Sequence, residues 1–219
     1  MMIDLNLLRE RTGLYRLLQA LYEYPLTADL LTAVSQLQAA PDSPLAKGLH
    51  PMQTYLAGND DVLETLNMEM TRLLEGPGQP AAPPYASYYL FNGRLMGPPA
   101  QAARQAYLEW NAWPDTSILM PDDHLMLELG FLAYLAERAA TALSEVEQRA
   151  ALAASRDFIT RQLRPWLPRF CVDLAQASSN SFFSGLAQLT DTAVNADLDW
   201  LTIVCFRDES VTELAVMAN

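Results

Sequence analysis

The residues that could take part in recognition or chemistry gather in two short stretches. Residues 83–87 carry Tyr85 and Ser87 behind two prolines, and residues 120–124 place Asp123 and His124 behind Pro121. Both stretches interrupt helical patterns, so we expect two loops on either side of one short helix. Loops held by a rigid scaffold are the usual location of binding groups. We therefore expect function to lie where these two loops meet.

Signatures of catalysis and metal binding are missing from the sequence. The only histidines are His50 and His124, and there is no Glu-x-x-His pair for a di-iron bundle or a zinc site. The segment 76–78, Gly-Pro-Gly, lacks the Lys-Ser/Thr of a phosphate-binding loop. Adjacent residues at a helix start point in different directions, which argues against Asp123 and His124 as a hydrolytic dyad. We predict no catalytic residues, no metal and no cofactor, and hence no enzyme.

Charge and composition restrict the partners. The 219 residues carry a net charge of −12, which argues against nucleic acid, because that affinity comes from basic residues that neutralise phosphates. An anionic membrane surface is disfavoured for the same reason. There is no apolar run of about 18 residues, so we expect no stable membrane insertion. An acidic field attracts basic partners, although solubility alone also explains a negative charge.

The cellular location is predicted from the cysteines and from the beginning of the chain. Two cysteines, Cys171 and Cys205, are too few for a disulfide framework. Residues 1–11 contain Asp4 and Glu10 and do not resemble a secretory signal. We expect a cytoplasmic protein, with one disulfide left open.

Hydrophobic periodicity predicts an all-α fold. Leu14, Leu17, Leu18 and Leu21 recur at helical spacing, and similar stripes continue to the end of the chain. No convincing alternating strands are present. We predict a single helical-bundle domain over residues 1–219, with a proline-rich hinge loop at 76–99. Exchange of an element across such a hinge is a low-cost route to dimers, so we expect a monomer that can also form a domain-swapped dimer.

Several residues have the types and spacing of helix ends. Asp61 with Glu64, and Ser144 with Glu147, stand at capping-box spacing. Gly76 suits a left-handed C-cap, and Pro77 prevents the helix from continuing. Pro99 suits the first turn of a helix.

The helix expected from about residue 123 to 141 should lie at the centre of the bundle. Asp122 or Asp123 is expected to cap it. Its apolar side chains lie nearly all round the helix, among them Leu127 and Leu132.

The ordered set of residues between 64 and 137 resembles the TorD/DmsD/NarJ family of redox-enzyme maturation chaperones. The matching residues are Glu69, Leu73, Leu74, Gly76-Pro77-Gly78, Pro84, Tyr85, Ser87, Tyr107, Pro121, Asp123, His124, Glu128, Leu129 and Phe131. The chain departs from the family pattern at Ala86, where a glutamate is frequent, and at Leu74, where phenylalanine is common.

The resemblance implies a function. Members bind the twin-arginine leader peptide, or the apo form, of a molybdopterin-dependent oxidoreductase, assist cofactor insertion and prevent premature export. A leader with paired arginines and an apolar helix requires carboxylates beside a hydrophobic groove. The expected peptide-binding residues are Tyr85, Ser87, Tyr88, Pro121, Asp122, Asp123, His124 and Glu128. Two alternatives stay open: a small helical enzyme or nucleotide-binding protein, and a structural subunit of a permanent oligomer.

Overall fold

A computed structural model describes residues 3–40, 42–76, 78–112 and 120–217, with side chains through residue 205. The regular secondary structure of these residues is helical, and the only β-type pairing among them is one isolated bridge. The all-α prediction is therefore confirmed. The helices are α1 (Leu5–Leu21), α2 (Ala28–Gln36), α3 (Ala46–Gly58), α4 (Val62–Met70), η1 (Thr71–Glu75), α5 (Ala86–Leu90), α6 (Pro98–Glu109), α7 (Leu125–Ala140), α8 (Glu145–Phe158), η2 (Ile159–Leu163), α9 (Leu167–Ala177) and α10 (Ser181–Met217). None of the helices described has the length and hydropathy needed to cross a membrane.

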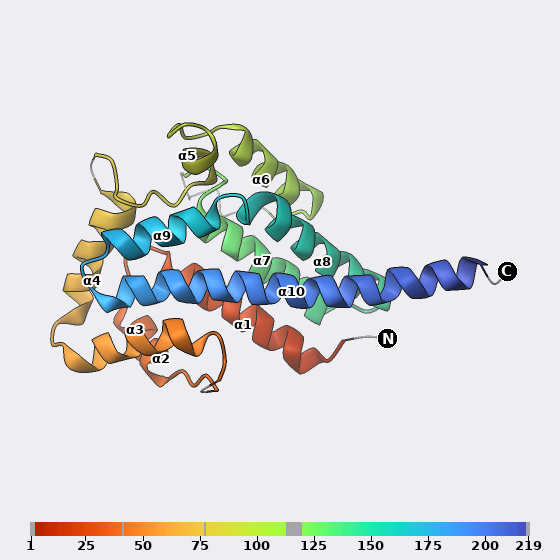
Figure 1. Cartoon of the computed structure of the whole chain (residues 1–219), viewed down its shortest axis with the longest axis horizontal. Helices are drawn as coiled ribbons and strands as arrows, with labels where there is room; N and C mark the ends of the chain where they lie inside the picture. The colour runs from red at the N-terminus through yellow and green to blue at the C-terminus, as the bar shows by residue number, and fades with distance from the viewer. Residues whose placement is uncertain (1–2, 41, 77, 113–119, 218–219) are drawn as a thin grey trace.

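The long helix α10 runs across one face of the bundle, and its last turns project beyond the other helices (Figure 1). The most extensive pairings join α1 to α7 and α3 to α10. One continuous apolar core extends from Leu8 in α1 to Leu201 in α10. The short α5 and the following α6 lie together at one edge, above α9 and α8 in this view (Figure 1).

The helix α7 is buried along most of its length, as its apolar residues predict. Leu127 and Leu132, which lie on different sides of the helix, are both buried. It packs against both α1 and α8. It therefore provides a rigid base for the residues at its own N-terminus.

The pair α3 and α10 crosses at two glycines. A Cβ atom added at Gly48 would lie 2.4 Å from the backbone nitrogen of Leu189 and 2.7 Å from the carbonyl oxygen of Gly185. A Cβ at Gly185 would lie 2.6 Å from the carbonyl oxygen of Gly48. Any side chain at either position would force the two backbones apart.

Two of the predicted helix ends differ from the structure. Asp61 has a left-handed backbone, with φ of 51°, and its side chain does not cap α4, so that capping box is wrong. Gly76 has φ of −56° rather than a left-handed value, because α4 first continues into the wider π-helical turn η1. A small residue is still required there, since a Cβ at Gly76 would lie 2.9 Å from the carbonyl oxygen of Thr71. Pro77 lies outside the described residues.

The other predicted helix ends agree better. The backbone N–H of Glu147 donates to Ser144 Oγ at 3.2 Å, which caps α8. The Glu147 carboxylate reaches back one residue further than expected, to the N–H of Leu143 at 3.0 Å. Pro99 lies in the first turn of α6, as predicted.

Glu69 joins the end of α4 to the connection between α9 and α10. It accepts two hydrogen bonds from Arg72, and its Oε1 accepts from both the N–H and the hydroxyl of Ser179 at 2.8 Å. These bonds, led by those from Arg72, lower the pKa of Glu69 to about 2. This residue of the family-like signature therefore fastens the scaffold that leads into the loop after η1.

Candidate functional site

The two loops predicted to carry function lie against each other. Tyr85 and His124 form the isolated antiparallel bridge. The N–H of Ala86 donates to the carbonyl of Asp123 at 3.1 Å, and the N–H of Leu125 donates to the carbonyl of Pro84 at 2.8 Å. We call residues 82–87 the strap: its first four residues cross the N-terminus of α7 without helical structure, and Ala86 and Ser87 begin α5.

The beginning of the strap is non-helical for a local reason. Proline has no N–H to donate, and it steers the preceding residue away from the helical region, so Ala82 and Pro83, which each precede a proline, favour a non-helical backbone. The carbonyl groups of Pro83 and Pro84 remain free to accept, and Pro84 uses its carbonyl for the bond to Leu125. At the other end the N–H of Ala82 donates to the carbonyl of Leu73 in η1 at 2.8 Å. The strap thus connects the end of η1 with the beginning of α7.

Asp123 and Ser87 form the centre of this connection, and both are fully buried. Asp123 Oδ2 accepts from the N–H of Ser87 at 2.6 Å, across 36 positions of sequence. Ser87 Oγ in turn accepts from the N–H of Gly97 at 3.0 Å, at the beginning of α6. One chain of hydrogen bonds therefore fixes α7, the strap and α6 relative to one another.

The cap of α7 is not an aspartate, so that prediction is wrong. His124 is the N-cap, and its Nδ1 accepts from the N–H of Met126 at 3.1 Å. Asp123 is one residue too early to cap, and its carboxylate is used by the strap instead. The side chain of Asp122 is 15% exposed, and its carboxylate pairs with Arg104 of α6 at 2.7 Å. The backbone carbonyl of Asp122 accepts from the Tyr107 hydroxyl at 2.8 Å.

His124 also contacts two residues outside its own helix. Its imidazole lies edge-on to the Tyr85 ring, with centroids 4.9 Å apart. Its Nε2 is 3.6 Å from Oε1 of Glu75, whose side chain is 35% exposed, whereas that of His124 is 1% exposed. Burial, assisted by the negative charges of Glu75 and Asp123, raises the pKa of Tyr85 to about 12. Glu75 is thus the accessible carboxylate of this group.

Glu128 lies one turn into α7 and is completely buried. Burial raises its pKa well above the ordinary value of 4.5, and the nearby charge of Asp123 adds to the increase. Gln162 and Trp166 oppose the shift by favouring the charged carboxylate, but in the described residues neither Glu128 oxygen makes a hydrogen bond of good geometry. A poorly aligned donor stabilises charge only weakly, so burial determines the direction of the pKa shift. Burial therefore favours the protonated form of Glu128.

The eight predicted site residues divide into two groups. Ser87, Asp123, His124 and Glu128 are buried, whereas Tyr85, Tyr88, Pro121 and Asp122 reach the surface in part. The Tyr88 hydroxyl accepts from Gln79 at 2.7 Å. The structure adds Glu75, Arg104 and Trp166 to this neighbourhood. Glu75 ends a predicted helix directly before the loop, which is a usable signal, while no sequence pattern marks Arg104 or Trp166.

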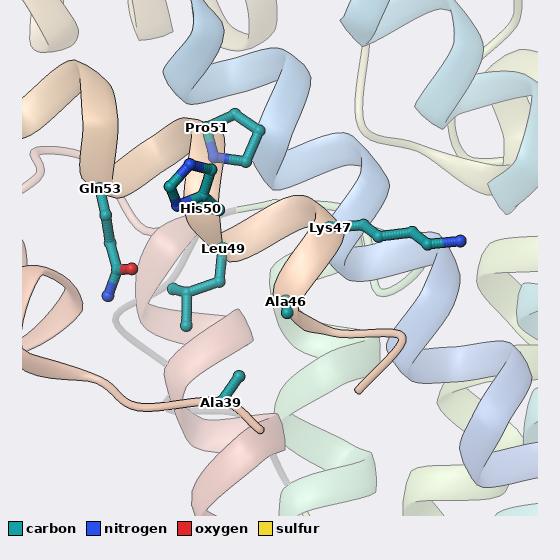
Figure 2. Close-up of a pocket in the computed structure, with 7 residues that line it drawn as sticks. All are labelled: Ala39, Ala46, Lys47, Leu49, His50, Pro51 and Gln53. Atoms are coloured by element: carbon teal, nitrogen blue, oxygen red, sulfur yellow. The ribbon is translucent and has the colours of Figure 1, made fainter. Parts of the chain in front are cut away.

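Other hollows lie away from this site. One, of about 430 Å³, is formed by the beginning of α3 and the connection before it. Figure 2 shows that Lys47 extends away from His50 and Gln53, so the polar groups around it do not converge. Gln53 is already occupied, because its amide donates to the carbonyls of Val34 and Leu37.

Comparisons with known proteins identify relatives of this chain. The family model described as nitrate reductase delta subunit matches residues 38–172. Chaperone protein TorD of Vibrio cholerae is 34% identical over 53% of this chain and 53% of its own length. Chaperone protein TorD of Aliivibrio salmonicida is 27% identical over 91% of this chain and 99% of its own length, and that of Aliivibrio fischeri is 28% identical over 88% and 94%. The chain thus spans about half of the first of these relatives and almost all of the other two.

The family match extends from the end of α2 into α9 and includes both loops of the site. It covers more than half of the chain. This chain belongs to the nitrate reductase delta subunit family.

Proposed function

We propose that this chain is a chaperone of molybdoenzyme maturation, which acts by binding rather than by catalysis. Its partner is the twin-arginine leader peptide, and the apo form, of a molybdopterin-dependent oxidoreductase. Membership in the family and the chaperone name of the relatives support the class of function. The observation that carries the proposal in this chain is a pair of partly exposed carboxylates near the Tyr85–His124 bridge: the side chain of Glu75 is 35% exposed and that of Asp122 is 15% exposed.

The predicted residues take two roles in this proposal. Glu75 and Asp122 meet the leader arginines, because guanidinium groups pair with carboxylates through charge-assisted hydrogen bonds. Tyr85, Tyr88 and Pro121 offer half-buried apolar surface to the neighbouring part of the leader. Asp123, Ser87, His124 and Glu128 are buried and hold that surface in place. The role of Asp123 thus changes from a direct arginine contact to a positioning residue.

The proposal is tested by calorimetric titration with synthetic twin-arginine leader peptides. Hydrogen bonds to charged groups contribute about 1.5–3 kcal/mol, so Glu75→Gln and Asp122→Asn should each weaken binding by roughly tenfold to a hundredfold. Asp123→Asn retains an oxygen that can accept from Ser87, and it should change the affinity much less. Glu137→Gln is the matched control, since Glu137 is an exposed carboxylate paired with Arg16 on another face.

Two results would count against the proposal. If wild-type protein binds none of the leader peptides, the proposed function is wrong. If wild-type protein binds a leader, and Glu75→Gln, Asp122→Asn and Glu137→Gln all bind it with the same affinity, the proposed function stands. The proposed arginine contacts are then wrong. Melting curves of each variant show whether a loss of affinity comes from loss of folding.

A further inference from the structure

A second concave surface lies between α6 and α8, apart from the strap. Its volume is about 420 Å³. The floor is aromatic, formed by Phe131 of α7 and Phe158 of α8, and the walls are small, with Ala102 and Ala106 on one side and Ala154 on the other. We call it the α6–α8 groove. Small walls above an aromatic floor leave room for one large apolar side chain of a partner.

The groove and the strap use different sides of α6. Ala102, Gln105, Ala106 and Glu109 follow the spacing i, i+3, i+4, i+7, which places them on one stripe of the helix. Tyr107 lies on the opposite side, where its hydroxyl bonds the carbonyl of Asp122. A peptide held at Asp122 therefore does not fill the groove.

The groove has charges of opposite sign at its two ends. Gln162 donates to the carbonyl of Pro99 at 2.8 Å, so η2, with Arg161, lies toward the beginning of α6. Glu109 and Trp110 come from the last turn of α6, and Asp157 of α8 faces the same groove. Asp157 already contacts Arg156, which leaves Glu109 as the carboxylate with no ion pair among the described side chains. Glu109 bonds only the amide of Gln105, at 3.0 Å.

These features define the occupant by its chemistry. We infer that the α6–α8 groove binds an amphipathic helical segment of the client polypeptide, outside the leader. The segment inserts one leucine or aromatic side chain over Phe131 and Phe158. It places a lysine or arginine at Glu109 and a carboxylate toward Arg161. The net charge of −12 makes the basic end the one attracted at long range, and it disfavours a second copy of this acidic chain as the occupant.

This inference rests on the proposed function for the identity of the partner, but its test is separate. The probe is a synthetic helical peptide of about 18 residues with a central tryptophan anchor, an arginine one turn before it and a glutamate one turn after it. A second peptide has the arginine and glutamate exchanged. Titrations use the full chain, and a twin-arginine leader peptide is titrated in parallel.

Three variants locate the binding. Ala106→Trp fills the groove and should weaken binding of the first peptide by at least roughly tenfold, which is the size of an interface anchor. Glu109→Arg should weaken the first peptide and strengthen the charge-exchanged one. Ala33→Trp is the matched control, because Ala33 is an exposed alanine of α2 away from the groove. Leader affinity should be unchanged in the two tryptophan variants, whereas Glu109→Arg, which removes two units of negative charge, should lower it only slightly through weaker long-range attraction.

Each other outcome contradicts the inference in a distinguishable way. If wild-type protein binds the leader but not the first peptide, or if Ala106→Trp binds that peptide as wild type does, the groove has no such occupant and the proposed function stands. If Ala106→Trp also loses the leader, the groove belongs to the leader site. If wild-type protein binds neither peptide, the proposed function falls together with this inference.

Discussion

Two regions hold distant parts of this chain together by different means. The α3–α10 crossing depends on the close approach of two backbones at Gly48 and Gly185. The strap depends on buried polar groups, in which Asp123 accepts from Ser87 and Ser87 accepts from Gly97. At the crossing, a side chain added to either glycine would push the two helices apart. At the strap, loss of an acceptor would leave a buried N–H without a partner. The scaffold is therefore specified by shape, and the site by the pairing of particular donors and acceptors.

The crossing should be the more sensitive of the two. Gly48→Ala places a methyl group 2.4 Å from a backbone nitrogen, and overpacking of a well-packed contact costs typically up to about 3 kcal/mol. We expect a loss of about 3 kcal/mol in the free energy of unfolding, measured by urea denaturation. Gly13→Ala is the control, since a Cβ there meets nothing within 4 Å, and it should gain about 0.5–1 kcal/mol from helix propensity. Equal effects of the two substitutions would show that the crossing is not a tight contact.

Asp123→Ala, which acts on the strap, should lower the free energy of unfolding by about 2 kcal/mol. The substitution removes a charged acceptor and leaves the buried N–H of Ser87 without a partner, and hydrogen bonds to charged groups contribute about 1.5–3 kcal/mol. Asp123→Asn keeps an oxygen that can accept, so its free energy of unfolding should fall by less than half as much. Hydrogen exchange distinguishes this effect from global unfolding: the amides of Ser87 and Gly97 should lose protection more than those of α10. Uniform loss along the chain would mean that the strap has no separate stability.

Glu128 gives the same region a dependence on pH. Its pKa in the folded state is raised above the ordinary 4.5, so the folded state keeps a proton that the unfolded state releases as pH rises above that value. The favourable contribution is complete below pH 4.5 and is lost as pH rises. Between pH 5 and 6, wild type should therefore lose up to about 1.4 kcal/mol relative to Glu128→Gln. Parallel stability curves for the two proteins would show that Glu128 titrates normally.

The difference between the scaffold and the site also explains which features could be predicted from the sequence. The burial of Leu127 and Leu132 and the cap at Ser144 follow from local spacing, so the all-α fold could be predicted. The meeting of the loops around Tyr85 and His124 was expected because both loops interrupt helices in the same way. The partner of Asp123 could not be predicted, because an aspartate at a helix start serves equally well as a cap or as a long-range acceptor. Only the fold decides that Ser87, 36 positions away, is the donor.

The smallest effect tests whether the accessible face of the strap region binds a partner. Arg104 pairs with Asp122 at 2.7 Å, but its side chain is 60% exposed, so the pair contributes only about 0.2–1 kcal/mol. Arg104→Ala should therefore change stability little. If Asp122 meets a leader arginine, Arg104 competes with it, and its removal should raise leader affinity by about two- to fivefold.

The matched control for Arg104→Ala is Arg16→Ala, which breaks another exposed ion pair, with Glu137 at 2.6 Å. Both substitutions remove one positive charge, so both change the long-range attraction of a basic peptide equally. Only the local competition at Asp122 differs between them. Higher leader affinity in Arg104→Ala alone would therefore place a peptide cation at Asp122. An equal rise in both variants would reflect net charge, and Asp122 would then be a residue that only orients α6 against the start of α7.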